Sequence, residues 1–248
     1  GSCDMGSFPH EFSGYRHVSD DATRAMFESL WGLDLSPKPG LRIPNMLDAA
    51  VGGEFKGLYV QGEDIAQSDP NTAHVTAALA AMELVVVQDL FLNETARYAH
   101  VFLPGTSFLE KDGTFTNAER RINRVRPVMT SRTGMSEWEA TCALAAAMGY
   151  PMHYANAAEI MDEIAAVTPT FAGVSFARLD EVGSLQWPVT GPDHDGTPIM
   201  HASAFVRGKG RFMETPYVAT EERSTRRFPL LLTTGRILSQ YNVGAQTR

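Results

Sequence analysis

An alternation of strand-like and helix-like segments in the first half of the chain constrains its fold more than any other feature. Short apolar runs at 55–62, 83–89 and 100–105 flank two segments of helical character at 69–83 and 93–99. A continuous apolar run is typical of a strand that is covered on both faces. Strand–helix–strand units join parallel strands through right-handed crossovers. These segments therefore predict an α/β fold with a doubly wound parallel sheet.

The rest of the chain predicts more helices and a few strands. Apolar residues at helical spacing predict helices over 20–32, 45–54, 136–149 and 156–167. Asp69 and Pro70 stand where the N-cap and first turn of the first crossover helix are expected. The polar, β-rich segment 113–125 is expected to be extended and to pair outside its own domain. A hairpin is expected at 205–215 and a buried strand at 228–235.

Composition and charge exclude several classes of protein. With 21 Lys and Arg against 29 Asp and Glu, the formal net charge is -8, so the chain lacks the basic face that a nucleic-acid backbone requires. No run approaches the roughly 18 apolar residues of a membrane span, and no secretory signal is visible. Cys3 and Cys142 are too few for a disulfide framework. We expect a cytoplasmic protein without nucleic-acid or membrane partners.

Polar residues and glycines follow the three predicted strands at the edge where open parallel sheets bind ligands. They are Gly62, Glu63 and Asp64 after the first run, Gln88 and Asp89 at the end of the second, and Gly105 after the third. Glycines let a ligand approach the backbone, and carboxylates accept the paired N–H donors of guanine. Acidic residues in such places also cap helices, and the phosphate-binding G-x-G-x-x-G pattern is absent. The pattern alone leaves a nucleotide site and a set of solvated caps as alternatives.

Other chemically active residues form no self-contained catalytic site. Arg236 follows the run at 228–235, and it either clamps an anion or a base edge or lies in an ordinary surface loop. Asp193, His194 and Asp195 are consecutive and cannot converge easily on a metal. We expect no metal ligand and no catalytic residue in this chain.

A basic cluster stands out in this acidic chain. It comprises ERR at 119–121 together with Arg124 and Arg126. This cluster is either a solvated extended segment or a contact for an anionic cofactor or partner. Cys142 lies on an apolar helix face, which is more typical of a core cysteine than of a nucleophile.

Six separated runs of the sequence resemble molybdopterin-dependent formate dehydrogenases. They are GSCDMG (1–6), LYVQGEDIAQSDPN (58–71), VVVQDLFLNETARYAHVFLPG (85–105), EKDGTFTNAERRINRV (110–125), QWP (186–188) and TTGRILSQYN (233–242). They follow the family's order and spacing over essentially the whole chain, and they are most similar to the large (alpha) subunit of the soluble, NAD-linked type. The match at GSCDMG argues against reading the leading Gly-Ser as the remnant of a tag.

The resemblance implies a molybdenum or tungsten ion held between two molybdopterin guanine dinucleotides (bis-MGD). The residues it assigns to one dinucleotide are Gly62, Glu63, Asp64 and Ser68, with Gln88 and Asp89 at the guanosine end and Gly105 nearby. Those it assigns to the pterin side, from a β-barrel, are Gly235, Arg236, Gln240, Tyr241 and Asn242. Glu137 stands where relatives often carry Asp, so its acceptor is kept with a longer reach. Ile237 and Gln240 also depart from residues found in some relatives.

The resemblance further implies that the chain is an internal piece of a larger protein. Its parts would be a Rossmann-like MGD-binding domain (1–107), an extended β segment (108–136), part of a second α/β domain (137–225) and the start of a C-terminal β-barrel (226–248). The family's metal-ligating Cys or selenocysteine, an adjacent His, an iron–sulfur cluster and a substrate-binding Arg would all precede Gly1.

By the same resemblance, the whole protein would oxidise formate reversibly to carbon dioxide. Electrons would pass through iron–sulfur clusters to a flavin (FMN) subunit that reduces NAD, with the cofactors carrying the chemistry. One alternative is another bis-MGD enzyme such as nitrate reductase, which the runs at 1–6 and 110–125 disfavour. The other is a cofactor-free structural subunit of an NADH-dehydrogenase-like complex, which the retention of Gln88, Asp89 and TTGR disfavours.

Overall fold

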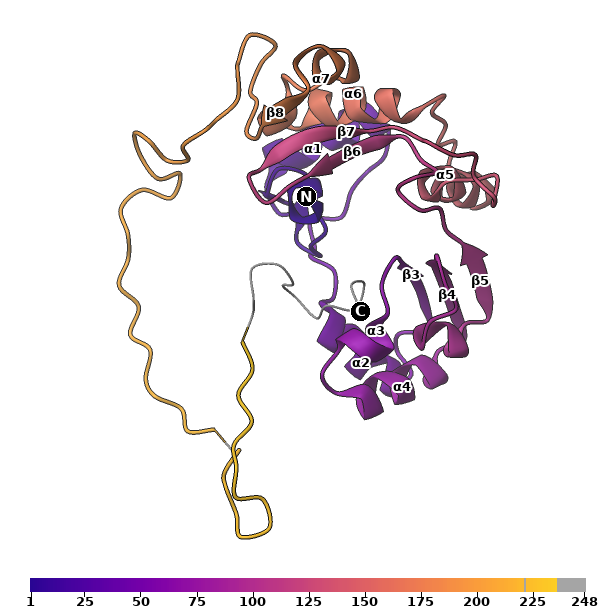
Figure 1. The fold of residues 1–248 in the computed structure, drawn as a ribbon, viewed down its shortest axis with the longest axis vertical. Coiled ribbons are helices and arrows are strands. Elements are labelled where there is room, and N and C mark those ends of the chain that lie inside the picture. The colour runs from indigo at the N-terminus through magenta and orange to yellow at the C-terminus, as the bar shows by residue number, and fades with distance from the viewer. Residues whose placement is uncertain (221, 236–248) are drawn as a thin grey trace. The chain divides into compact units, whose positions relative to one another are not determined.

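The computed structural model describes residues 1–220 and 222–235 and divides the chain into two units, Gly1–Pro198 and Ile199–Arg248 (Figure 1). Every helix and strand of the described residues lies in the first unit. None of these helices combines the length and the hydropathy that crossing a membrane requires.

The predictions of a hairpin at 205–215 and of a strand at 228–235 are wrong. A turn does form, because the Gly208 N–H donates to the Phe205 carbonyl at 2.9 Å, but no strands flank it. A strand is stable only when a neighbouring strand pairs with its backbone. Among the described residues, no segment pairs with 228–235, and Leu232 is 92% exposed.

The predicted parallel sheet is confirmed as a three-stranded sheet in the order β3–β4–β5. Its strands are β3 (Gly57–Gln61), β4 (Leu84–Asp89) and β5 (Val101–Pro104). α4 (Thr72–Ala81) connects β3 to β4, and the short 3-10 helix η2 (Thr95–Tyr98) connects β4 to β5. The three apolar runs of the sequence are therefore the three strands of the sheet, and the segments between them contain the helices that connect those strands.

The start of α4 differs from the prediction. A short helix, α3 (Ile65–Ser68), lies directly before it, and Asp69 is the C-cap of α3 rather than the N-cap of α4. The N-cap of α4 is Asn71, whose Oδ1 accepts from the His74 N–H at 3.2 Å. α2 (Ile43–Val51) confirms the helix predicted at 45–54.

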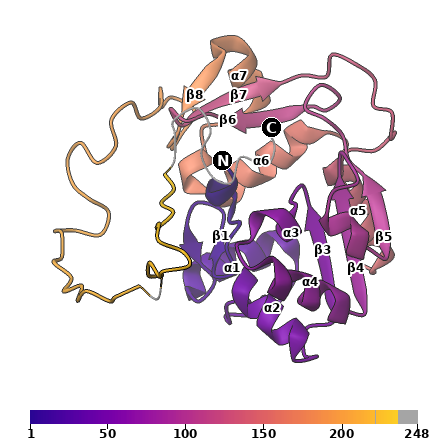
Figure 2. The same cartoon turned by 60° about the horizontal axis from the view of Figure 1, so that its bottom comes forward.

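The helices α2, α3 and α4 gather on the sheet and enclose its core (Figure 2). The fully buried members include Ala50, Val75, Ala78, Val85 and Val87. Val85 and Val87 point to the same face of β4, since side chains alternate along a strand. This packed layer holds the three strands in fixed register and so fixes the position of their carboxyl ends.

A second, antiparallel sheet has the order β6–β7–β8. Its strands are β6 (Gly113–Thr116), β7 (Arg121–Val125) and β8 (Ser184–Gln186). The expectation that 113–125 is extended is confirmed: it forms the β6–β7 hairpin, and β7 also pairs with β8, which lies outside the predicted segment 108–136. α6 (Ala157–Val167), the short η3 (Pro169–Phe171) and α7 (Phe176–Val182) pack beside this sheet around Ile122 and Leu179.

The remaining elements, among them two strands that pair as a two-stranded sheet, belong to neither of these two sheets. They are η1 (Ser2–Met5), β1 (Glu11–Phe12), β2 (Arg16–His17), α1 (Asp21–Trp31) and α5 (Glu137–Ala147). The helices predicted at 20–32 and 136–149 are thus confirmed. Asp20 caps α1, and a capping box of Ser136 and Glu139 starts α5. The domain borders at 107, 136 and 225 stay predictions.

Candidate functional site

The carboxyl ends of β3, β4 and β5 meet at one edge of the parallel sheet. Gln61 of β3 lies opposite Gln88 of β4, and Asp89 lies opposite Pro104 of β5. Beyond these pairs, the Gly62 N–H donates to the Gln88 carbonyl and the Gly105 N–H to the Asp89 carbonyl, each at 2.9 Å. The fold therefore brings together the residues that the sequence singled out after three separate strands.

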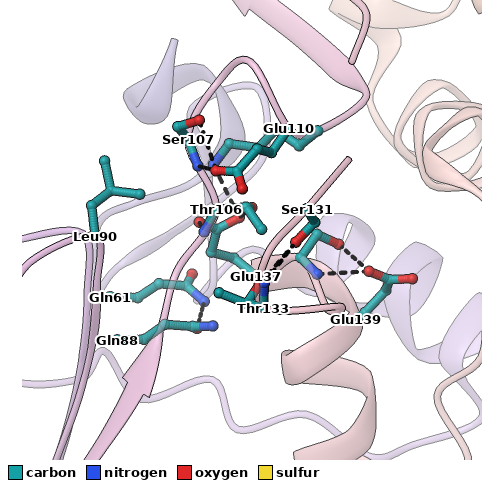
Figure 3. Close-up of polar contacts among 12 residues, drawn as sticks. Gln61, Gln88, Leu90, Thr106, Ser107, Glu110, Ser131, Thr133, Glu137 and Glu139 are labelled. Carbon is teal, nitrogen blue, oxygen red and sulfur yellow. Dashed lines mark hydrogen bonds and ion pairs between the residues drawn. The ribbon is translucent and has the colours of Figure 1, made fainter. Parts of the chain in front are cut away.

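Gln88 is a buried polar side chain at this edge, with 1% of its surface exposed. Its Oε1 accepts from the Tyr59 hydroxyl at 2.5 Å. It also accepts from Gln61 Nε2 at 2.8 Å (Figure 3). Both lone pairs of the amide oxygen are then used. The capacity that Gln88 keeps for a ligand is therefore that of a donor, through Nε2.

Asp89 shapes the loop that follows β4. Its Oδ1 accepts from the Leu90 N–H at 2.6 Å, and its Oδ2 accepts from Asn93 Nδ2 at 2.9 Å. Asn93 in turn accepts from the Ala96 N–H at 2.9 Å and so leads into η2. A carboxylate offers about four acceptor positions. Each oxygen of Asp89 therefore keeps one position for a further donor.

The loop after β3 combines an open glycine with an internal brace. Gly62 has φ +66°, and no atom lies within 4 Å of the place where its Cβ would stand. Asp64 Oδ1 accepts from both the N–H and the hydroxyl of the fully buried Thr95, at 3.0 and 2.6 Å. Ser68 donates to the exposed Glu63 at 2.5 Å. Asp64 thus ties this loop to η2, whereas Gly62 offers its backbone to an approaching group.

Gly105 and Glu137 are in contact at the end of β5. A Cβ on Gly105 would lie 3.2 Å from Glu137 Oε1 and 3.3 Å from the Asp89 carbonyl carbon. Glu137 accepts from the Thr106 N–H at 2.9 Å, from the Thr106 hydroxyl at 2.8 Å and from Lys111 Nζ at 2.9 Å. A side chain at position 105 would therefore require Glu137 or the loop to shift by a few tenths of an ångström.

The hydrogen bonds to Glu137 keep it ionised. Burial alone would raise the pKa of Glu137, but the hydrogen bonds from Lys111 and Thr106 outweigh burial and lower that pKa. Glu137 acts as a brace of the β5 loop, and no sequence pattern pointed to Thr106 or Lys111 as its partners. A second brace lies next to it, where Glu110 accepts from the Ser107 N–H and hydroxyl (Figure 3).

The predicted pterin-side residues all come from the second unit of the chain, Ile199–Arg248. Gly235 is exposed and belongs to no helix or strand. Arg236, Gln240, Tyr241 and Asn242 lie outside the described residues. Their roles stay predictions.

The arginines of the basic cluster in the β6–β7 hairpin have hydrogen-bonding or ionic partners within the chain. Arg124 contacts Asp112 at 2.7 Å and Asp180 at 3.1 Å, and Arg126 also contacts Asp180. Arg120 donates to backbone carbonyls, among them that of Thr197 at 3.0 Å. These internal partners favour the alternative of a solvated extended segment over that of a contact for an anionic ligand.

One group of potential metal ligands was missed by the sequence patterns. Within the described part of the chain, His10, Glu11 and His17 are the three side chains of this kind whose ligand atoms converge. No H-x-H or H-E-x-x-H spacing marks them, because a hairpin brings them together. By contrast, burial, and then the charge of Glu139, raises the pKa of the Cys142 thiol, which disfavours a nucleophilic role.

Comparison with known proteins identifies relatives of the sequence. A family model described as molybdopterin oxidoreductase matches residues 3–147. The chain is 39% identical over 253 residues to the F420-dependent formate dehydrogenase subunit alpha of Methanocaldococcus jannaschii, covering 100% of this chain and 37% of the relative. It is 35% identical over 253 residues to formate dehydrogenase H of Escherichia coli, covering 100% of this chain and 35% of that protein.

The chain therefore spans little more than a third of the length of these relatives. Among solved structures, acetylene hydratase from Pelobacter acetylenicus is similar in fold, with a TM-score of 0.51 at 18% sequence identity. The similarity covers 79% of this chain and 28% of that one. It supports the α/β architecture with a parallel sheet.

Proposed function

The chain belongs to the molybdopterin oxidoreductase family, and we propose that it contributes the guanosine-binding edge of an MGD site in the large subunit of a formate dehydrogenase. The observation that carries the proposal is the meeting of Gly62, Gln88, Asp89 and Gly105 at one edge of the parallel sheet. Ligands of open parallel sheets bind at this edge.

The residues at the edge fit the guanosine end of such a cofactor. Gln88 offers donors through Nε2, and Asp89 offers one acceptor position on each carboxylate oxygen. Guanine presents the matching set, two adjacent N–H donors and a carbonyl acceptor. Gly62 leaves open space for a close approach to the backbone. We propose that Gln88 and Asp89 hold the base and that Gly62 admits the neighbouring part of the dinucleotide.

The other assigned residues support this edge or complete it. Asp64 and Glu137 hold the loops after β3 and β5, and Glu63 with Ser68 forms the outer rim. Gly235, Arg236, Gln240, Tyr241 and Asn242 are proposed as pterin contacts from the family resemblance. When bound, the bis-MGD group supplies two-electron redox chemistry at molybdenum or tungsten.

The proposed reaction is the reversible conversion of formate to carbon dioxide, one proton and two electrons. The names of the relatives support this substrate. We propose further that electrons leave through iron–sulfur clusters, held elsewhere in the whole protein, to an FMN-containing subunit that reduces NAD in the cytoplasm. The relative from Methanocaldococcus jannaschii is named as F420-dependent, so the acceptor must be tested by itself.

The test compares Asp89→Asn with Glu94→Gln in the full-length protein. Glu94 lies in the same loop and its side chain is 47% exposed, so the control removes the same charge without touching the edge. An amide at position 89 loses a charged acceptor, which weakens binding of the base by roughly ten- to a hundredfold. Asp89→Asn should therefore lower both the guanosine monophosphate released by acid hydrolysis and the content of molybdenum or tungsten.

Two outcomes would contradict separate parts of the proposal. Wild-type amounts of metal and guanine in Asp89→Asn would remove Asp89 from the site. Formate-dependent reduction of F420 but not of NAD would overturn the proposed acceptor while leaving the formate reaction intact. Glu94→Gln should match the wild type in all three measurements.

A further inference from the structure

The short hairpin before α1 places three potential metal ligands on one side. β1 and β2 pair antiparallel, with Glu11 directly opposite His17. The Val18 N–H donates to the His10 carbonyl at 3.0 Å, which holds His10 beside this pair. The imidazole rings of His10 and His17 have centroids 5.6 Å apart. The hairpin lies next to α1 (Figure 2).

We propose that His10, Glu11 and His17 bind a divalent transition-metal cation of the zinc type, with water completing its coordination. One ligand atom from each side chain lies within 4.8 Å of the other two. Ligand atoms about 2.1 Å from a tetrahedral zinc ion are about 3.4 Å apart. Metal binding would therefore require the side chains of the half-buried His10 and the exposed His17 to rotate toward each other.

The kinds of donor select the class of cation. Two imidazoles and one carboxylate form a set that holds zinc with an open coordination position. Calcium and magnesium prefer oxygen ligands, so the imidazoles disfavour them. The neighbouring Arg16 does not compete for Glu11, because its guanidinium contacts Thr23 Oγ1 and the Val167 carbonyl.

The His10 ring lacks the close polar partners that the rings of His74 and His100 have. Its Nδ1 is buried and has no partner among the described residues, and its Nε2 lies 3.7 Å from Glu11 Oε1, beyond hydrogen-bonding distance. In contrast, His74 Nε2 lies 3.0 Å from Asp48 Oδ1, and His100 Nδ1 accepts from the Val85 N–H at 3.0 Å. A bound cation would give the His10 ring the strong polar partner it lacks.

The experiment measures uptake of Zn²⁺ by the full-length protein after removal of loosely bound metal with a chelator. Equilibrium dialysis against buffered Zn²⁺, followed by elemental analysis, gives the bound zinc of the wild type, His10→Asn, His17→Gln and Glu11→Gln. We expect each variant to bind at this site at least about tenfold more weakly, comparable to the losses on disturbing a metal's ligand environment. Glu11→Gln has nearly the same shape as the wild type and so separates lost ligation from lost folding.

His74→Gln is the matched control, because His74 has a carboxylate partner but no third ligand. It should bind as much zinc as the wild type, and circular dichroism should show every variant folded. The proposal is overturned if the wild type binds no more zinc than the His10→Asn, His17→Gln double variant. It is also overturned if Glu11→Gln and His74→Gln lower zinc binding equally. Zinc content is independent of formate oxidation, so this result does not depend on the proposed function.

Discussion

Replacing Glu137 by alanine tests whether this carboxylate holds the loop at the end of β5. Glu137 accepts both hydrogen bonds of Thr106 and contacts Lys111. Thr106 is 1% exposed, so its N–H and hydroxyl depend on the carboxylate as their acceptor. An unsatisfied buried polar group costs about 1–3 kcal/mol. Glu137→Ala leaves two such groups of Thr106 without their acceptor, and the loop can relax in part. We therefore expect Glu137→Ala to lower the local stability of the loop by about 2–4 kcal/mol.

The contact with Lys111 adds less, since its side chain is 28% and that of Glu137 23% exposed. Water screens such a pair and reduces its contribution. Glu137→Gln keeps an acceptor for Thr106 but loses the charge, so it should cost about 1 kcal/mol. Because the fold lowers the pKa of Glu137, the stabilisation is complete above the unfolded-state pKa of about 4.3 and is lost as the pH falls through the folded-state value. The difference between wild type and Glu137→Gln should shrink in acid.

Hydrogen exchange of the Thr106 amide in the full-length protein measures this local stability directly. A loss of 2–4 kcal/mol accelerates exchange by roughly 30- to 1,000-fold. The control is Glu83→Ala, which removes a carboxylate paired with Lys56 at 2.6 Å but 68% exposed. It should leave Thr106 unchanged. Exchange of Thr106 in Glu137→Ala within about threefold of the wild type would refute the reasoning, because the carboxylate would then not hold the loop.

Two further substitutions test the packing and charge pairs of the second sheet. Gly173→Ala would place a Cβ 1.9 Å from the Gly191 carbonyl oxygen. Thermal denaturation should show a free energy of unfolding lower by about 1–3 kcal/mol or more. The control is Gly191→Ala, whose Cβ meets no atom within 4 Å and which should be as stable as the wild type. Arg124→Ala breaks the contacts with Asp112 and Asp180. Because these carboxylates are 41% and 47% exposed, water screens the pairs, and the expected loss of stability is only about 1–2 kcal/mol. Hydrogen exchange of the β6–β7 hairpin measures this loss. Arg124→Lys should recover only part of the lost stability, because lysine keeps the charge but not the guanidinium geometry. Full recovery of the stability would show that the charge alone matters.

The parallel sheet could be predicted because its signals are local. Each apolar run is long enough to define a strand, and the crossover segments between them carry their own helical pattern. The start of α4 could not be placed, because Asp69 and Asn71 are both good caps and only the short α3 before them decides between the two. Strand pairing is not local. Besides β6, β7 pairs with β8, which lies about sixty residues away, and no pattern in 113–125 predicts this pairing.

The same difference between local and non-local signals decides which features of the candidate site could be predicted. The residue types at the strand ends could be read from the sequence, because the end of each run marks them. Their hydrogen-bonding capacity could not, since it depends on neighbours such as Tyr59 and Gln61, which use the acceptor of Gln88. The cluster that contains His10 and His17 could not be predicted, because the spacing of its members matches no metal-binding pattern. Only the pairing of β1 with β2 brings them together.

The internal hydrogen bonds of Asp89 bear on which base the proposed site would prefer. The Leu90 N–H and the Asn93 side chain each use one acceptor position on a different carboxylate oxygen. One position remains on each oxygen, spaced as a pair. Guanine offers two adjacent N–H donors that fill such a pair, whereas adenine offers one amino group and would leave one of the two free acceptor positions to water. One hydrogen bond fewer to a charged acceptor costs about 1.5–3 kcal/mol, or roughly ten- to a hundredfold in affinity. The loop that fixes Asp89 in place therefore also sets the basis for guanine over adenine.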